Sequence, residues 1–180
     1  AAVYGQTEKW PIVEDIPKNP INAYGLSKWL AEQAVQHWHE VYGIPTLTFR
    51  MFNGYGPRSN HNDVFGIFMK KKNLGEAITI TGDGSALRDF VFVTDIIDAF
   101  IKGLESTQSG KTYNIGSGNP RSIKDLAMLF SDNIQYLPKR ENDLPVICAD
   151  INSICKELNW KPEVSLENGV SKLLSTISNN

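Results

Sequence analysis

The chain of 180 residues lacks most of the features that mark disulfide-rich, metal-binding, membrane-spanning and nucleic-acid-binding proteins. Its two cysteines, Cys148 and Cys155, have no His or Cys neighbours at metal-ligand spacing, so neither a metal site nor a disulfide framework is expected. No apolar run approaches the roughly 20 residues that cross a bilayer, and the first residues do not have the layout of a signal peptide. The net charge is −2 and the longest basic run is Lys70-Lys71-Lys72, which disfavours a nucleic-acid partner.

Together these absences predict a cytoplasmic protein with ordinary reduced thiols and with neither a membrane nor a nucleic acid as partner. Hydrophobic residues make up 41% and charged residues 21% of the chain. Both fractions are usual for globular proteins, so disorder is not expected. The length fits one domain or slightly more.

Alternating helical and strand-like patterns predict an α/β fold without a linker or an internal repeat. Helices are expected over residues 24–42, 62–72, 94–104, 152–158 and 166–175, with a further helix opening at Ser122. Strands are expected over residues 44–50, 78–81, 89–93, 112–115 and 134–137. Thr94 is expected to cap its helix. On the first helix, an apolar stripe that we expect to pack against a sheet or a partner consists of Leu26, Leu30, Ala34 and Trp38.

The run Tyr24-Gly25-Leu26-Ser27-Lys28 is the first candidate for chemistry. Residues four apart lie on the same helix face, so the two end side chains can interact. A phenol loses its proton only near pH ~10 in water, and a neighbouring cation favours the charged form. Tyr24 with Lys28 is therefore a candidate acid–base pair, although a surface Tyr–Lys pair would have the same spacing.

Two loops contain candidates for binding an anion. Residues 53–58 read Asn-Gly-Tyr-Gly-Pro-Arg, and residues 82–90 read Gly-Asp-Gly-Ser-Ala-Leu-Arg-Asp-Phe. The arginine at position 88 suits phosphate because its planar guanidinium presents a fork of donors. The alternative for Arg88 is a local ion pair with Asp83 or Asp89, which is a common surface arrangement.

Taken in order, the motifs at 24–28, 53–58, 82–90, 113–118 and 158–162 resemble the extended short-chain dehydrogenase/reductase family. The resemblance is to its NAD-dependent nucleotide-sugar epimerases and dehydratases, of the UDP-glucose 4-epimerase type. It implies that Tyr24 and Lys28 are catalytic and contact NAD, and that the protein forms a homodimer through helices that include 24–42. It also implies contacts to a nucleoside-diphosphate sugar from Asn53, Arg88, Arg140 and Asp143. A solvated surface turn is the alternative for Arg140.

The pyrophosphate-binding half of that family pattern is not found in this sequence. The Gly-x-Gly runs at 54–56, 82–84 and 116–118 have no glycine three places further on, as a dinucleotide-binding turn requires. The resemblance therefore predicts the C-terminal part of a longer enzyme: a partial Rossmann-type parallel sheet plus a smaller α/β substrate-binding domain. Residues 1–60 would be the remnant of the NAD-binding domain. Residues 61–180 would mainly bind the nucleotide sugar, interleaved with the last Rossmann strands.

The expected reaction follows from the resemblance. Tyr24 would take a proton from a sugar hydroxyl while hydride passes to NAD, and return of the hydride to the opposite face of the keto intermediate would invert that carbon. Similar 4,6-dehydratases have Asp-Glu where this chain has Ala1-Ala2, and alanine cannot transfer a proton. A UDP-sugar 4-epimerase is therefore favoured over a dehydratase. A decarboxylase, a ketosugar reductase and an inactive nucleotide-sugar binding module stay open as alternatives.

Overall fold

The computed structural model describes residues 1–139 and 144–175. The predictions for Arg140 and Asp143 lie outside these described residues. In chain order the elements are η1 (Ala2–Tyr4), α1 (Ala23–Tyr42), β1 (Leu47–Met51), β2 (Asn53–Tyr55), α2 (Val64–Asn73), β3 (Ile78–Thr81), β4 (Leu87–Arg88), β5 (Phe90–Phe92), α3 (Val93–Glu105), β6 (Lys111–Ile115), β7 (Arg121–Ser122), α4 (Ile123–Met128), β8 (Ile134–Leu137), β9 (Val146–Ile147), α5 (Asn152–Leu158) and α6 (Leu166–Ser175).

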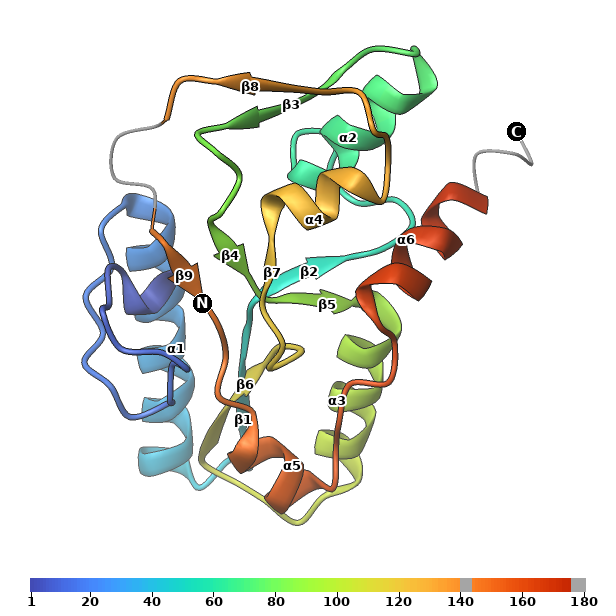
Figure 1. Ribbon diagram of the computed structural model, residues 1–180. Helices are drawn as coiled ribbons and strands as arrows, with labels where there is room; N and C mark the ends of the chain where they lie inside the picture. The colour runs from blue at the N-terminus through green and yellow to red at the C-terminus, as the bar shows by residue number, and fades with distance from the viewer. Residues whose placement is uncertain (140–143, 176–180) are drawn as a thin grey trace.

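Strands β1 and β6 form a parallel pair between helices, as Figure 1 shows. Helix α1 lies on one side of the pair, where Glu32 meets Arg50 of β1. Helix α3 lies on the other side, and Gly103 approaches the ring of Phe49 so closely that an added Cβ would lie 2.7 Å from it. Covering both faces with helices is typical of parallel strands.

The remaining strands form short pairings around this centre. Strand β2 pairs in parallel with β5, and β3 pairs in parallel with β8. Strand β4 lies between β7, which runs antiparallel to it, and β9, which runs parallel. The predicted α/β class with parallel strands is thus confirmed.

The helix ends follow local capping chemistry in most places. The side chain of Asn22 accepts a hydrogen bond from the Gly25 amide at the start of α1, and Gly43 ends the helix with φ of 66°, as expected of a left-handed C-terminal glycine. The prediction that Thr94 caps α3 is wrong. Strand β5 runs directly into the helix, so Phe92 occupies the cap position without a side-chain hydrogen bond and α3 begins at Val93.

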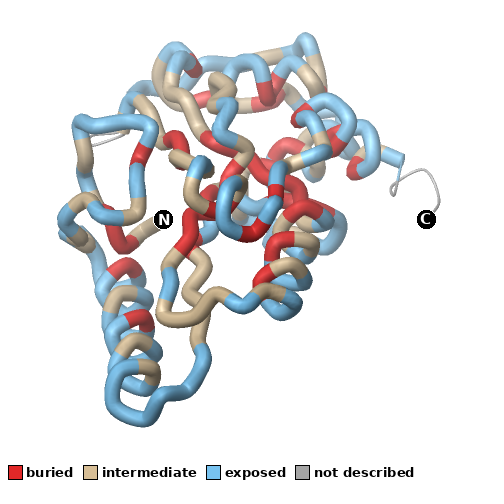
Figure 2. Tube along the Cα trace, turned by 90° about the horizontal axis from the view of Figure 1, so that it is seen from below, coloured by how far each residue is buried: buried red, intermediate tan, exposed pale blue. Residues whose placement is uncertain are grey.

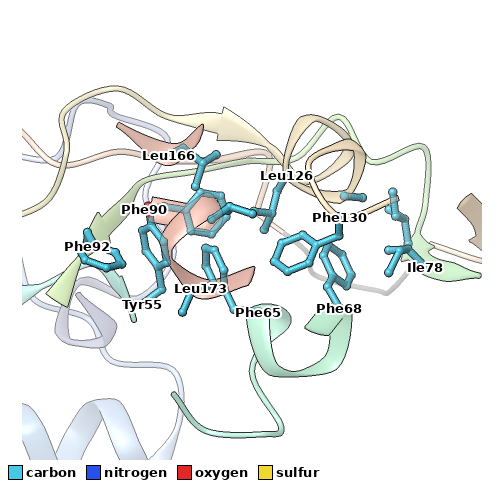
Figure 3. Packing of buried hydrophobic residues seen from close by; sticks show 13 residues of the cluster. Tyr55, Phe65, Phe68, Ile78, Phe90, Phe92, Leu126, Phe130, Leu166 and Leu173 are labelled. Atoms are coloured by element: carbon cyan, nitrogen blue, oxygen red, sulfur yellow. The ribbon is translucent and has the colours of Figure 1, made fainter. Parts of the chain in front are cut away.

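The largest hydrophobic core joins β2, β3 and β5 to α2, α4 and α6, and Figure 3 shows its packing. Its buried members are Tyr55, Phe65, Phe68, Ile78, Ile80, Phe90, Phe92, Leu126, Ala127, Phe130, Leu166, Val170 and Leu173. A second cluster fills the space between β6, α3 and α5, and a third holds the η1 segment against Phe52 and Ala149. Helix α1 contributes little to these cores.

Within the largest core, Tyr55 is buried without a partner for its hydroxyl group. Its ring stacks on Phe65 at 4.2 Å and meets the edge of Phe92 at 5.3 Å. Its hydroxyl group points at Gly169 of α6, where an added Cβ would lie only 2.0 Å away. Among the described residues this hydroxyl group has no hydrogen-bond partner, and burial raises the pKa of the Tyr55 phenol above its ordinary value.

We expect Tyr55→Phe to raise the free energy of unfolding by about 1 kcal/mol, because it removes a buried polar group that forms no hydrogen bond. The matched control is Tyr113→Phe, whose hydroxyl group donates to Glu157 at 2.8 Å. That variant should instead lose about 1 kcal/mol. Urea denaturation of the three proteins checks both signs, and equal losses in the two variants would contradict the assignment.

The apolar stripe of α1 is largely exposed. Leu26, Leu30 and Trp38 are about half exposed, and Figure 2 shows the long helix at the lower left exposed over most of its length. The residues of α1 that are buried are Gly25 and Glu32. The stripe is therefore available to a partner rather than packed on the sheet described here. Within the described residues, no helix has the length and apolar character needed to cross a membrane.

Candidate active site

Tyr24 and Lys28 occupy the first two turns of α1 and lie together. The ammonium group of Lys28 is 5.5 Å from the centroid of the Tyr24 ring, and 63% of the Tyr24 surface is exposed. Both side chains line a groove of about 470 Å³ that extends along β1 to Phe100 of α3. The predicted pair is thus brought together at an open surface that another molecule or a further segment of chain can reach.

This groove follows the outer edge of β1. Among the strands that the structure describes, β1 pairs with β6 alone. The opposite edge therefore has no strand beside it within residues 1–139 and 144–175. An exposed strand edge presents backbone donors and acceptors that can pair with a further strand.

Asn53 lies at the start of β2 and is held by one carbonyl group. Its side-chain Nδ2 donates to the carbonyl oxygen of Asp89 at 3.0 Å, and its backbone amide donates to the same oxygen at 3.1 Å. Asn53 lines a second pocket, of about 260 Å³, together with Asn22 and Leu144. This pocket shares Ala1 and Ala2 with the groove of Tyr24, so the two cavities are neighbours.

Arg88 lies beside that second pocket. One of its guanidinium nitrogens donates to the carbonyl oxygens of Leu87 at 2.9 Å and Leu144 at 2.8 Å. Leu144 lines the pocket of Asn53, whereas Arg88 itself does not line it. The structure does not describe the other two predicted substrate contacts, Arg140 and Asp143, although both precede Leu144 closely in the chain.

The carboxylate of Asp89 binds backbone groups rather than the neighbouring arginine. It is fully buried and accepts hydrogen bonds from the amides of Ser117 at 2.6 Å, Gly118 at 3.1 Å and Ala149 at 2.9 Å. The hydroxyl group of Ser117 also donates to it at 2.6 Å. Sequence reasoning considered Asp89 only as an ion-pair partner and missed this role, which depends on residues 28 to 60 positions away.

A second buried network, also missed from the sequence, holds α1 against β1. Arg50 forms a two-pronged ion pair with the Glu32 carboxylate and donates to the Tyr4 hydroxyl oxygen at 2.8 Å and to the Glu14 carbonyl oxygen at 2.7 Å. The Tyr4 hydroxyl group donates to Asn114 at 2.6 Å. Burial disfavours the charged guanidinium, but the hydrogen bonds with Glu32 and Tyr4 outweigh it and raise the pKa of Arg50.

Burial raises the pKa of the Tyr4 phenol above its ordinary value, against the opposing effect of Arg50. The tyrosine in this network therefore stays protonated and serves as a hydrogen-bond donor. Tyr24, which is more than half exposed, has no such enclosure. Among the described residues, no group of three or more His, Cys, Asp and Glu side chains is placed to hold a metal ion.

The profile of the NAD dependent epimerase/dehydratase family matches residues 1–116. The chain therefore belongs to the NAD-dependent epimerase/dehydratase family.

Individual relatives are similar along almost the whole chain. The UDP-glucose 4-epimerase of Mycolicibacterium smegmatis is 31% identical over 99% of this chain. Among solved structures, UDP-glucose 4-epimerase of Thermotoga maritima with UDP-glucose has a TM-score of 0.91 and 29% identity, covering 99% of this chain and 60% of that one. UDP-glucuronic acid 4-epimerase of Bacillus cereus, in complex with UDP-glucuronic acid and NAD, has a TM-score of 0.90 and 28% identity, covering 99% and 59%. The chain spans 60% of the length of the Mycolicibacterium smegmatis relative and 43% of the length of an Arabidopsis thaliana relative, putative UDP-arabinose 4-epimerase 4.

Proposed function

We propose that this chain supplies the proton-transfer helix and the nucleotide-sugar side of an NAD-dependent enzyme, most specifically a UDP-sugar 4-epimerase. The observation that carries the proposal is the exposed Tyr24–Lys28 pair, which lies near the pocket that Asn53 lines. Relatives and structural neighbours named as UDP-sugar 4-epimerases support it. The enzymatic activity would be that of the longer protein.

In this mechanism Tyr24 acts as the acid and base. Its phenolate would take the proton of the sugar hydroxyl and later return it, while the nearby ammonium group of Lys28 favours the phenolate over the phenol. Asn53 and Arg88 would bind the nucleoside diphosphate, with Arg140 and Asp143 as further predicted contacts. NAD, when bound, would supply reversible acceptance of a hydride from the sugar carbon.

The residues present fit one side of an NAD site. Lys28 lines the groove beside the Tyr24 ring, and it would hold the nicotinamide ribose of NAD. A pyrophosphate group needs a glycine-rich turn at a helix N-terminus, and the three Gly-x-Gly runs of this sequence do not continue as that turn requires. We therefore propose that the edge of β1 pairs with a further strand of the longer protein. A glycine-rich turn elsewhere in that longer protein would bind the pyrophosphate.

The proposed division at residue 60 gives the first part to the cofactor side and 61–180 mainly to the nucleotide sugar. Interleaving fits the pairing of β1 with β6 and of β2 with β5, since each pair joins the two parts. We also propose a homodimer through the exposed stripe of α1, because large exposed apolar surfaces usually mark interfaces. A cytoplasmic location and the absence of a nucleic-acid partner remain proposals based on composition.

The proposed function is tested by incubating the full-length protein with NAD and UDP-glucose and following UDP-galactose by proton NMR. UDP-glucuronic acid and UDP-N-acetylglucosamine extend the substrate panel. Inversion at the sugar C4 without net consumption of NAD is the expected result. Release of water, release of carbon dioxide or net oxidation of NADH would instead identify a dehydratase, a decarboxylase or a reductase.

We expect Arg88→Ala to weaken binding of UDP by about 1.5–3 kcal/mol, the range of a hydrogen bond to a charged group. The control is Arg121→Ala, which removes a guanidinium group paired with Glu167 at 2.6 Å on the surface. It should leave UDP affinity unchanged. Isothermal titration calorimetry on both variants makes the comparison. Equal affinities in the two variants would assign Arg88 a structural role through its bonds to Leu87 and Leu144.

We expect the 180-residue chain alone to bind NAD too weakly to measure, because backbone amides of the missing glycine-rich turn supply much of pyrophosphate binding. Fluorescence titration with NAD, combined with light scattering, tests this. The same light-scattering experiment reports self-association through the α1 stripe. Micromolar NAD affinity of a monomer would show that the cofactor site lies within these residues.

A further inference from the structure

Three residues of α1 line the same groove at intervals of four: Tyr24, Lys28 and Glu32. At this spacing the Lys28 ammonium group has two neighbours along the helix face, the Tyr24 ring on one side and the Glu32 carboxylate on the other. If Lys28 formed an ion pair with Glu32, the negative charge of Glu32 would cancel the positive charge of the ammonium group. That ammonium group would then stabilise the phenolate of Tyr24 less. The helix sequence alone would therefore allow the cation to be neutralised.

The structure avoids that ion pair. Within residues 1–139 and 144–175, Lys28 forms no ion pair with any carboxylate, and its ammonium group lies over the Tyr24 ring. The carboxylate of Glu32 is instead bound on both oxygens by Arg50 and is 9% exposed. Arg50 is fixed in turn by the Tyr4 hydroxyl group and the Glu14 carbonyl group.

We propose that Arg50 is a positioning residue that occupies Glu32 and thereby keeps the Lys28 ammonium group available to Tyr24. This inference rests on the proposed role of Tyr24 in proton transfer. Arg50 would touch neither sugar nor cofactor in doing so. Its guanidinium group binds a carboxylate through two parallel hydrogen bonds. The negative charge of Glu32 is therefore neutralised by Arg50 and attracts Lys28 only weakly.

Other charged or titratable groups also approach the Glu32–Arg50 pair. They are Tyr4 of the first segment, and Glu14, Asp15 and Lys18 of the loop before α1. The ammonium group of Lys18 donates to the Glu14 carbonyl oxygen at 2.6 Å. Lys18 is thus held on the loop by this hydrogen bond. We do not expect it to replace Arg50 as the partner of Glu32.

The decisive measurement is an ultraviolet difference titration of tyrosine ionisation in the full-length protein, each background minus the same background with Tyr24→Phe. In Arg50→Met the midpoint should move up by about one pH unit, since Glu32 then attracts Lys28. Arg50→Lys, which keeps a cation beside Glu32, should retain the wild-type midpoint. The double variant Glu32→Gln/Arg50→Met should also return to it, because glutamine carries no charge.

A second pair of variants leaves the buried network of Arg50 and Glu32 unchanged. These variants test the proposal even if Arg50→Met does not fold. Ala31 lines the same groove and is exposed. Ala31→Glu places an unpaired carboxylate three residues from Lys28 and should raise the midpoint, whereas Ala31→Gln should not. Unchanged midpoints in Arg50→Met or Ala31→Glu, or an equal rise in the double variant, would overturn the proposal. Because the titration needs no turnover, a failure of the epimerase assay alone would count against the proposed function only.

Discussion

Tyr24→Phe should lower kcat of the full-length protein by about 10²–10⁴-fold while leaving its fold intact. The substitution removes only the hydroxyl group that carries the transferred proton. The Tyr24 side chain is 63% exposed and lines an open groove, so its loss should not disturb the core. Steady-state kinetics with a UDP-sugar, together with circular dichroism and the melting temperature, measures both parts of the expectation.

Tyr42→Phe is the matched control for this substitution. Tyr42 lies on the same helix and is also 63% exposed, but it packs against Trp38 at the far end of α1. Its variant should keep wild-type kcat. Turnover of Tyr24→Phe close to that of Tyr42→Phe would remove Tyr24 from the proposed mechanism.

The largest expected effect on stability is that of Asp89→Ala. The substitution leaves the buried amide of Ala149 and the partly buried amides of Ser117 and Gly118 without their acceptor. A buried donor without a partner costs about 1–3 kcal/mol, and partly buried donors cost less because water can reach them, so the free energy of unfolding should fall by about 3 kcal/mol. Urea denaturation at neutral pH measures this loss.

Asp83→Ala is the control in the same region of the chain. Its carboxylate is exposed and accepts hydrogen bonds from the backbone amide and the hydroxyl group of Ser85 in a surface turn. We expect almost no change in the denaturation midpoint. If the two aspartate variants were equally stable, the amides around Asp89 would have other acceptors. The hydrogen bonds of Asp89 would then not stabilise the fold.

Features that depend on neighbouring residues could be predicted from the sequence. The helix expected over 24–42 was correct to within one residue because the apolar spacing, the start near Tyr24 and Gly43 are all local signals. The interaction of Tyr24 with Lys28 was likewise predictable from helix geometry. The position of Thr94 as a cap was wrong, because the direct transition from β5 into α3 is set by the sheet and not by the residues at the helix start.

Features that depend on distant residues could not be predicted in this way. Arg50 and Glu32 are 18 positions apart, and Tyr4 and Asn114 are 110 apart. No periodicity or spacing rule connects such pairs. The link between Asn53 and Arg88 through Asp89 and Leu144 also appears only once β2, β5 and β9 are assembled. The residue types were visible in the sequence, but their partners were not.

The hydrogen bonds of Asp89 also bear on how the site region opens locally. One carboxylate binds amides from two segments, the turn at Ser117–Gly118 and the backbone at Ala149, while its own carbonyl oxygen binds Asn53. Neither segment can separate from Asp89 without breaking hydrogen bonds to the carboxylate that the other segment also binds, so fluctuations of the two segments are coupled. The wall beside the Asn53 pocket therefore behaves as one cooperative unit, although its residues come from three distant parts of the chain.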